Sequence, residues 1–528
     1  MIIGSLRSAG PCRRPSGGSG RRARLRAVPS VPTVPVVPTV RTVPLPDGFG
    51  IVFDAETQFV GEDVLFGGSP PRLMRLNAAG VRALRELRDD GLVRSAAGGR
   101  LARRLTDTGM AHPRPPGGPA PDTGMAHRRA PAGPGLDPGH VTVVIPVKDR
   151  QAELDRCLSA LGAAYPVLVV DDGSRDPAAT AALCRRHGAR LLRRPESGGP
   201  GAARNDGLAA VTTPLVAFLD SDCVAGPDWI AGLAGHFADP IVGAVAPRVR
   251  PVTGPGVAGR YLYARAPIDL GPWEARVAPL TRLSYVPTAA LLALRDAVAA
   301  GFDASLRYGE DVDLVWRMTE AGWRVRYDPG AEVGHAEPGR WAAILARRFR
   351  YGTSAAPLAR RHPGQVPPLV LQAWPAAAVA ALLARRPVTA LAAYGAGTAQ
   401  LVRLLRDWGV PERNVLRPMA FSVQQTWLGA GRWSVQYALP AVAVGLARPG
   451  GRSARARLGR RVALASLVLG PPAAQWRRGR PPLDPVRFTL GYLADEAAYG
   501  AGVYRGALAE RLAAPLLPKI AWRPLPRR

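Results

Sequence analysis

The chain has 528 residues, enough for two to four domains, and its 70 Lys and Arg against 40 Asp and Glu give a formal net charge of +30. Such a charge is typical of nucleic-acid binding, but only Lys148 and Lys519 are lysines, aromatic residues make up 6%, and no nucleic-acid motif occurs, so we exclude nucleic acid as a partner. The four cysteines form no CxxC pair, which favours a reducing cytosol over a structural zinc site.

The first third of the chain predicts a disordered extension and then a small α+β domain. The extension is rich in Gly, Ser and Arg and then in Pro–Val pairs, and it lacks the continuous apolar segment of a secretory signal. After it, Ile51–Phe53 and Asp63–Gly68 predict a β-hairpin. Ala78–Asp89 predicts a helix with Asn77 as its N-cap.

A Pro- and Gly-rich linker follows this small domain. The hexapeptide Asp107–His112 recurs at Asp122–His127, and the Pro-rich run between the two copies cannot pack as regular structure. We interpret the repeat as a duplication in a connection that tolerates changes of length.

Three apolar runs that each lead to aspartates carry the chemistry. Between the first two runs, residues 152–164 have helical spacing, which predicts a β-α-β unit and hence parallel strands whose carboxyl ends share one edge. Ligands of open α/β sheets bind outside that edge. The runs and their acids are Val141–Pro146 with Asp149, Val167–Val170 with Asp171 and Asp172, and Pro214–Leu219 with Asp220 and Asp222. Taken alone, the last pair is more often a solvated turn than a metal site.

Two further segments complete the predicted crevice. The Gly-rich loop Ser197–Gly201 and the following helix suit an anion, and Arg204 is placed to clamp a phosphate. Glu310, Asp311 and Asp313 open a second helix, where acids complement the helix dipole. We interpret Asp313 as structural and Asp311 as a general base facing the crevice.

These motifs, in this order over residues 141–335, resemble the inverting family 2 glycosyltransferases, which share the GT-A α/β fold and use a nucleotide-sugar donor with a divalent metal. The resemblance implies that Asp149 and Asp172 hold the uridine, Arg204 faces the nucleotide or diphosphate, Asp220 lies near the ribose or sugar, Asp222 ligates Mg²⁺ or Mn²⁺, and Asp311 is the base. His335 matches a late histidine that touches the metal or diphosphate in several such enzymes, although a structural histidine explains it equally well. Glu337–Trp341 has Glu where the processive Gln-x-x-Arg-Trp signature has Gln, which argues against a processive mechanism.

The last third of the chain is rich in Ala, Leu and Val and predicts helices. Its uncharged runs are bounded by Arg and fall short of the roughly 18–20 apolar residues of a spanning helix. We therefore expect amphipathic docking on the inner, cytoplasmic face of a bacterial cell membrane, with a buried helical bundle as the alternative.

The small domain resembles the PqqD-like modules, winged-helix-like domains that grip a precursor peptide at a strand edge. All three parts together resemble the glycosyltransferases of the mycofactocin system. That resemblance implies transfer of glucose from UDP-glucose onto premycofactocin or its precursor peptide, in a short β-1,4 chain. The alternatives are a family 2 enzyme with a lipid or cell-wall acceptor and a peptide-binding scaffold with a degenerate transferase domain. The expected organisation is residues 1–45 disordered, 46–111 PqqD-like, 112–139 linker, 140–364 GT-A domain and 365–528 helical and membrane-associated.

Overall fold

The computed structural model describes residues 43–116, 137–406, 408–410, 413–448 and 453–521. The expected disordered extension therefore lies almost wholly outside the described residues. So does most of the expected linker, including the second copy of the repeated hexapeptide.

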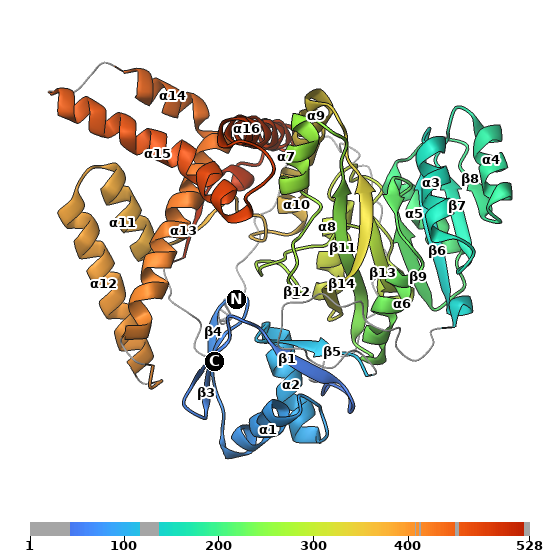
Figure 1. Cartoon of the computed structure of the whole chain (residues 1–528), viewed down its shortest axis with the longest axis horizontal. Helices are drawn as coiled ribbons and strands as arrows, with labels where there is room; N and C mark the ends of the chain where they lie inside the picture. Colours follow the sequence, from blue (N-terminus) through green and yellow to red (C-terminus); the bar gives the residue numbers. More distant parts are fainter. Residues whose placement is uncertain (1–42, 117–136, 407, 411–412, 449–452, 522–528) are drawn as a thin grey trace, which may run out of the picture. The chain divides into compact units, whose positions relative to one another are not determined.

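The largest sheet of the described residues is a nine-stranded mixed sheet (Figure 1). Its order is β10-β14-β11-β13-β9-β6-β7-β8, with β12 paired to β14. The neighbours β6 and β7, and β6 and β9, are parallel, as the sequence predicts. Strand β8, which is not predicted from the sequence, is parallel to β7. The strands are β6 (Val141–Val147), β7 (Val167–Asp171), β8 (Arg190–Arg193), β9 (Leu215–Leu219), β10 (Cys223–Val224), β11 (Val242–Val252), β12 (Ala275–Val277), β13 (Ala290–Leu294) and β14 (Arg324–Ala336).

Helices cover both faces of this sheet, because its central strands are apolar on both sides. In β6, Val143 and Ile145 belong to the core that packs under α3, while Val144 points the other way, into the core shared with α8. The helices are α3 (Gln151–Leu161), α4 (Pro177–Arg186), α5 (Pro200–Ala210), α6 (Asp228–Ala234), α7 (Val257–Arg265) and α8 (Glu310–Glu320), with 3₁₀ turns at Pro138–His140, Gly235–Ala238 and Asp296–Val298.

One strand prediction needs correction. Strand β6 does not end at Pro146 but continues to Val147. Its pairing with β9 stops at Val144, so the missing N–H of Pro146 removes no hydrogen bond from that ladder. His335 lies near the end of the 13-residue β14, whose pairing with β11 shifts register after Asp328.

The small N-terminal domain contains two sheets and two helices. Asn77 accepts a hydrogen bond from the Gly80 amide at 2.9 Å and caps α1, as predicted. The predicted hairpin is wrong, because β1 pairs with β5 and β3 pairs with β2 and β4. The elements are β1 (Gly50–Phe53), β2 (Gln58–Val60), β3 (Val64–Gly67), β4 (Arg72–Arg75), α1 (Ala78–Asp89), α2 (Ala96–Thr108) and β5 (Ala111–Arg114).

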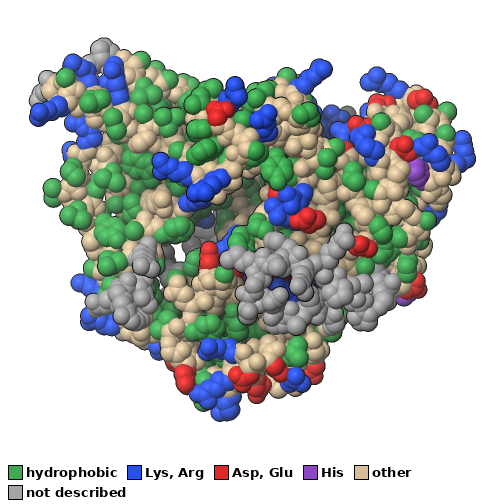
Figure 2. Space-filling model, in the orientation of Figure 1, with side chains coloured by type: hydrophobic (Ala, Val, Ile, Leu, Met, Phe, Trp, Pro, Cys, Tyr) green, Lys and Arg blue, Asp and Glu red, His purple; other side chains and the backbone are tan. Residues whose placement is uncertain are grey.

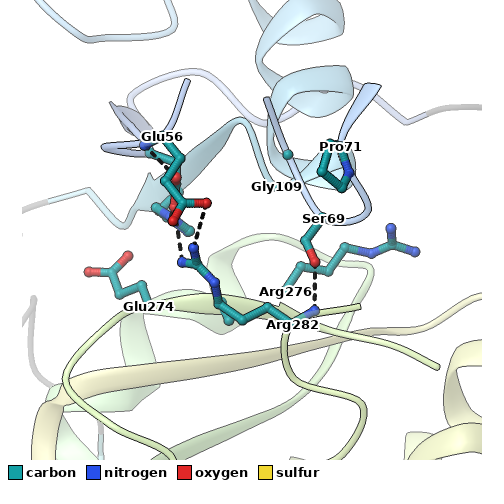
Figure 3. Close-up of a pocket in the computed structure, with 11 residues that line it drawn as sticks. Glu56, Ser69, Pro71, Gly109, Glu274, Arg276 and Arg282 are labelled. Atoms are coloured by element: carbon teal, nitrogen blue, oxygen red, sulfur yellow. Dashed lines mark hydrogen bonds and ion pairs between the residues drawn. The ribbon is translucent and has the colours of Figure 1, made fainter. Parts of the chain in front are cut away.

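Buried charge joins this domain to the large sheet. The Arg103 side chain, on α2, donates to Asp239 at 2.7 Å, and both side chains are almost fully buried. Asp107 accepts two hydrogen bonds from Arg324 of β14, at 2.7 and 2.8 Å. A cavity of about 130 Å³ also lies at this junction, where Arg282 pairs with Glu56 (Figure 3). Charged side chains from the small domain and from the large sheet therefore pair with one another across this junction.

The last third of the chain is helical, as predicted, and we call residues 373–479 the arm. No helix of the described residues is long and apolar enough to cross a membrane. Glycines let α16 lie against α9: a Cβ at Gly502 would stand 1.9 Å from the Phe349 carbonyl oxygen. The elements are α9 (Trp341–Thr353), α10 (Ala355–Arg361), β15 (Val370–Gln372), α11 (Ala373–Leu383), α12 (Pro387–Arg406), α13 (Arg413–Tyr437), α14 (Leu439–Ala447), α15 (Ala454–Gly479), α16 (Pro485–Ala509), a 3₁₀ turn at Ala514–Leu516 and β16 (Lys519–Ala521).

Candidate active site

Asp149 follows β6 at the carboxyl edge of the sheet and has an unusual backbone. Its φ of 54° lies in the left-handed region, which costs free energy in a residue with a side chain. The conformation is held by hydrogen bonds from the Asp149 amide to the Ser174 hydroxyl and from the Arg175 amide to the Asp149 carboxylate, at 2.9 and 2.7 Å. The carboxylate remains partly exposed at the crevice, as a nucleoside-binding group requires.

Asp172 follows β7 and organises the Gly-rich loop. The amides of Gly198 and Gly199 each donate to its carboxylate at 2.9 Å, and the Ser197 hydroxyl donates at 2.7 Å. Burial acts to raise the pKa of Asp172, but these hydrogen bonds and the Arg194 guanidinium hold that pKa below its ordinary value. Both carboxylate oxygens are thus engaged by the protein, so the predicted contact of Asp172 with uridine stays a prediction.

Arg204, on α5, is a buried bridge between two parts of the crevice. It donates to Asp220 after β9 at 2.5 Å and to Glu310 at the start of α8 at 3.0 Å. Its Nε is buried and has no hydrogen-bond partner among the described residues. The structure therefore commits both ends of this guanidinium to carboxylates, and a direct contact with the diphosphate stays a prediction.

Asp222 and His335 lie together, as the predicted metal site requires. The His335 Nε2 is 3.4 Å from one oxygen of Asp222, and Arg150 is ion-paired with the other. On the far side of the imidazole, Nδ1 lies 3.1 Å from the Glu337 carboxylate, which also pairs with Arg347. Burial acts to lower the pKa of His335, but the Glu337 and Asp222 carboxylates raise it.

Asp311, the predicted base, is partly buried on the α8 side of the crevice. Burial, followed by repulsion from Glu310, raises the pKa of Asp311 to about 7. Tyr285 and Tyr351 lie within electrostatic range of its carboxylate, and burial raises the pKa of Tyr351 to about 12. A carboxylate whose pKa is near neutrality is matched to proton abstraction at physiological pH.

Asp313 has the structural role that the sequence predicts. It is buried and accepts from Arg317 at 2.8 Å and from Arg361 at 2.7 Å, and it also contacts His362.

The donor set suits a divalent cation that is shared with a substrate. No group of three or more His, Cys, Asp and Glu side chains able to hold a metal occurs among the described residues. Asp222 and His335 offer two ligands, and Mg²⁺ and Mn²⁺ commonly take the rest from substrate phosphates and water. The residues therefore fit a metal that binds together with a diphosphate.

Several residues of the site do not stand out in the sequence. Glu310 is adjacent to the predicted base, but nothing in the sequence shows that Arg204 reaches it across the chain. Glu337 does carry a signal, since it departs from a known signature. Arg347 and Tyr351 carry no such signal. They lie on α9, and the sequence does not show how that helix packs against the sheet.

Comparison with known proteins identifies the class. The model of "Glycosyl transferase family 2" matches residues 142–288, which include the strand-end aspartates. The pre-mycofactocin glycosyltransferase of Mycobacterium tuberculosis (strain ATCC 25618 / H37Rv) is 37% identical over 500 residues, covering 90% of this chain and 98% of that protein. Glycosyltransferase AglE of Haloferax volcanii is 28% identical over 230 residues, 40% of this chain and 71% of its own length. Among solved structures, the mannosyltransferase PcManGT from Pyrobaculum calidifontis in complex with GDP-Man and Mn²⁺ aligns with a TM-score of 0.34 at 21% identity, covering 56% of this chain and 90% of its own.

The fold, the family match and the strand-end carboxylates together define a glycosyltransferase with a GT-A-like mixed α/β sheet, which confirms the predicted fold class and enzyme class. Within that class the extent of the match is decisive, because it spans the small domain, the sheet and the helical region alike. The chain belongs to the pre-mycofactocin glycosyltransferases of family 2.

Proposed function

We propose that this enzyme transfers glucose from UDP-glucose to premycofactocin with inversion, building a short β-1,4-linked chain. The acceptor is supported by the name of the relative that is 37% identical over nearly its whole length. The observation that carries the mechanism is the partly buried Asp311, whose raised pKa is suited to a base, on the α8 side of a crevice whose strand edge holds Asp222.

Two sets of side chains act in the reaction: Asp311 as the base, and Asp222 with His335 at the leaving diphosphate. The acceptor hydroxyl oxygen forms a bond to the anomeric carbon while the bond from that carbon to the diphosphate breaks, and the electron pair leaves with UDP. Asp311 takes the hydroxyl proton in the same step. Asp222 and His335 would hold Mg²⁺ or Mn²⁺, which supplies positive charge for the leaving diphosphate. No protein nucleophile is required for inversion.

The acceptor side has a wall of tyrosines around the base. Tyr285 and Tyr351 lie close to Asp311, and Tyr499 of α16 joins them with Arg348 over its ring at 5.1 Å. The C-terminal helices thus contribute to the acceptor site. Flat aromatic faces suit a ring-bearing acceptor and an added glucose unit.

The small domain is proposed to bind the precursor peptide weakly by strand addition. Within the described residues, β2 and β4 are the two edges of their sheet, so each has unpaired backbone groups. Deleting residues 46–111 should lower transfer to premycofactocin more than UDP-glucose hydrolysis. Equal loss of both activities, with no peptide binding by calorimetry, would leave a bracing role through Arg103 and Asp107.

The deciding experiment is a panel of nucleotide sugars with premycofactocin, with and without Mn²⁺ or Mg²⁺, followed by mass spectrometry of the products. Stepwise addition of hexose units to premycofactocin, with UDP-glucose as the only active donor of the panel, would support the proposal. Transfer only to lipid or cell-wall acceptors would show that premycofactocin is not the acceptor. Absence of both transfer and donor hydrolysis would favour a peptide-binding scaffold, a reading that the intact Asp222 and Asp311 already weigh against.

A further inference from the structure

Arg348, on α9, is a buried cation whose guanidinium makes no hydrogen bond within the described part of the chain. Figure 2 shows many basic side chains, in blue, at the surface, where water satisfies their N–H groups. The Arg348 side chain is instead only 9% exposed. The Asp495 carboxylate of α16 lies 2.7 Å from its Nε, but at an angle that makes an ion pair and no hydrogen bond. A buried donor without an acceptor costs free energy and calls for a functional explanation.

The carboxylates near Arg348 are balanced without it. Asp495 is ion-paired with Arg265 of α7, which is also ion-paired with the neighbouring Glu496. Arg432, in the arm, lies with its Nε 3.0 Å from Glu496. Both carboxylates are almost fully buried, and Arg265 and Arg432 already match their two negative charges. Arg348 is the third cation beside two anions, so removing its guanidinium leaves both carboxylates paired.

Arg348 stands at the acceptor side of the crevice. Its guanidinium carbon lies 5.1 Å from the centre of the Tyr499 ring. Tyr285 is within electrostatic range of Arg348, Tyr499 and the proposed base Asp311. Tyr285, Asp311 and Tyr499 are each partly exposed, so this cluster is open to solvent. The unsatisfied guanidinium therefore lies beside the place where the proposed reaction puts the acceptor.

We propose that Arg348 selects the acceptor by donating hydrogen bonds to a carbonyl or carboxylate oxygen of that molecule. The inference rests on the proposed function, which places the acceptor at Asp311. A guanidinium carries only N–H donors, so it pairs with a bare oxygen and not with an amine or an alkyl group. Such an oxygen satisfies the buried donors, while the tyrosine rings hold the apolar part of the same molecule. Arg348 thus acts in acceptor recognition and Asp311 in proton transfer.

The full-length parent enzyme gives the first test, with three phenols that share a ring and differ in one substituent. They are para-ethylphenol, para-hydroxyphenylacetamide and para-hydroxyphenylacetate, which carry no carbonyl, a neutral carbonyl and a carboxylate. Dissociation constants come from ligand-observed NMR titrations, which need no turnover. Hydrogen bonds to a charged group correspond to roughly 10- to 100-fold in affinity, so we expect a preference of that size for the amide or the carboxylate over the ethyl compound. The tighter of the two identifies the oxygen.

The variant Arg348→Met removes the donors and keeps an unbranched side chain. Its matched control is Arg350→Met, on the same helix but exposed to solvent. We expect Arg348→Met to bind all three phenols alike and to lose roughly 10- to 100-fold in kcat/KM for premycofactocin. Its KM for UDP-glucose and its urea midpoint should match those of the parent, because both buried carboxylates keep a cation. The control should match the parent throughout.

Three outcomes would overturn the proposal: the parent shows no preference among the phenols, the preference persists in Arg348→Met, or that variant loses stability and raises the KM of donor and acceptor alike. The parent titration decides the question even where Arg348→Met does not fold. Failure of the proposed function gives a different result. A preference that Arg348→Met abolishes, in an enzyme that does not glycosylate premycofactocin, would leave the role of Arg348 standing and exclude only the named acceptor.

Discussion

Replacing Asp311 by Asn should slow the enzyme and stabilise it at the same time. The amide keeps the shape of the side chain but cannot accept the acceptor proton. Removing a general base costs roughly 10²–10⁴ in kcat. Donor binding should change little, because Asp311 lies on the proposed acceptor side, near Tyr285 and Tyr351.

The stability gain follows from the pKa. The unfolded chain ionises Asp311 from its ordinary pKa of 3.8, whereas the folded protein keeps the proton until the pKa of about 7. The folded state thus binds more protons between these values, so this carboxyl lowers stability as pH rises through that window and lowers it fully above pH 7. Three pKa units correspond to about 4 kcal/mol, which is the upper limit of the gain in Asp311→Asn.

The assay is urea unfolding of parent and variant at pH 4 and pH 8, beside kcat at pH 8. We expect the two proteins to be alike at pH 4 and the variant to be more stable at pH 8. In the parent, kcat should rise with pH through an inflection near 7 and then level. A variant that loses activity and stability together at pH 8 would show that Asp311 is a structural residue, and the reasoning from burial would be refuted.

Three further predictions address the rest of the molecule. Asp222→Ala should abolish Mn²⁺- or Mg²⁺-dependent turnover while leaving thermal unfolding unchanged, and full activity in the presence of a chelator would contradict this. Glu337→Gln should weaken Mn²⁺ binding in the presence of UDP by roughly tenfold or more, as measured by electron paramagnetic resonance, since partners that orient a metal-binding His have effects of this size. Arg103→Met leaves the buried Asp239 without its cation and should cost about 3–5 kcal/mol in urea unfolding, and a loss below about 1 kcal/mol would show that the junction relaxes.

Sequence reasoning succeeded where local chemistry repeats along the chain. Parallel strands with acids at their ends can share only one edge, so the positions of Asp149, Asp172 and Asp220 followed from three short runs. The N-cap at Asn77 followed from residues in direct sequence contact.

It failed where partners are distant in the chain. The pairing of β1 with β5 joins segments about 60 residues apart, and no local pattern encodes it. The same holds for the protein partners of Arg204, which the sequence does not show, whereas its contact with a phosphate stays a prediction. The structure gives that charge to Asp220 and Glu310, from two different elements. The number of carboxylates near an arginine decides its role, and that number is a property of the fold.

The contacts of Glu337 explain why this position has Glu and not the Gln of the processive signature. Its carboxylate is almost completely buried, with one oxygen near the His335 Nδ1 and the other paired with Arg347. A carboxylate accepts from two donors at once, whereas Gln has a single acceptor oxygen and would set its NH₂ group against one of them. A proton held on Nδ1 by Glu337 leaves the Nε2 lone pair directed toward Asp222, where the proposed metal would bind. Glutamate at this position is therefore required by its neighbours, and a side chain buried among them is not available to grip a growing glucan. We propose that this arrangement favours release of the acceptor after each addition, consistent with the departure from the processive signature.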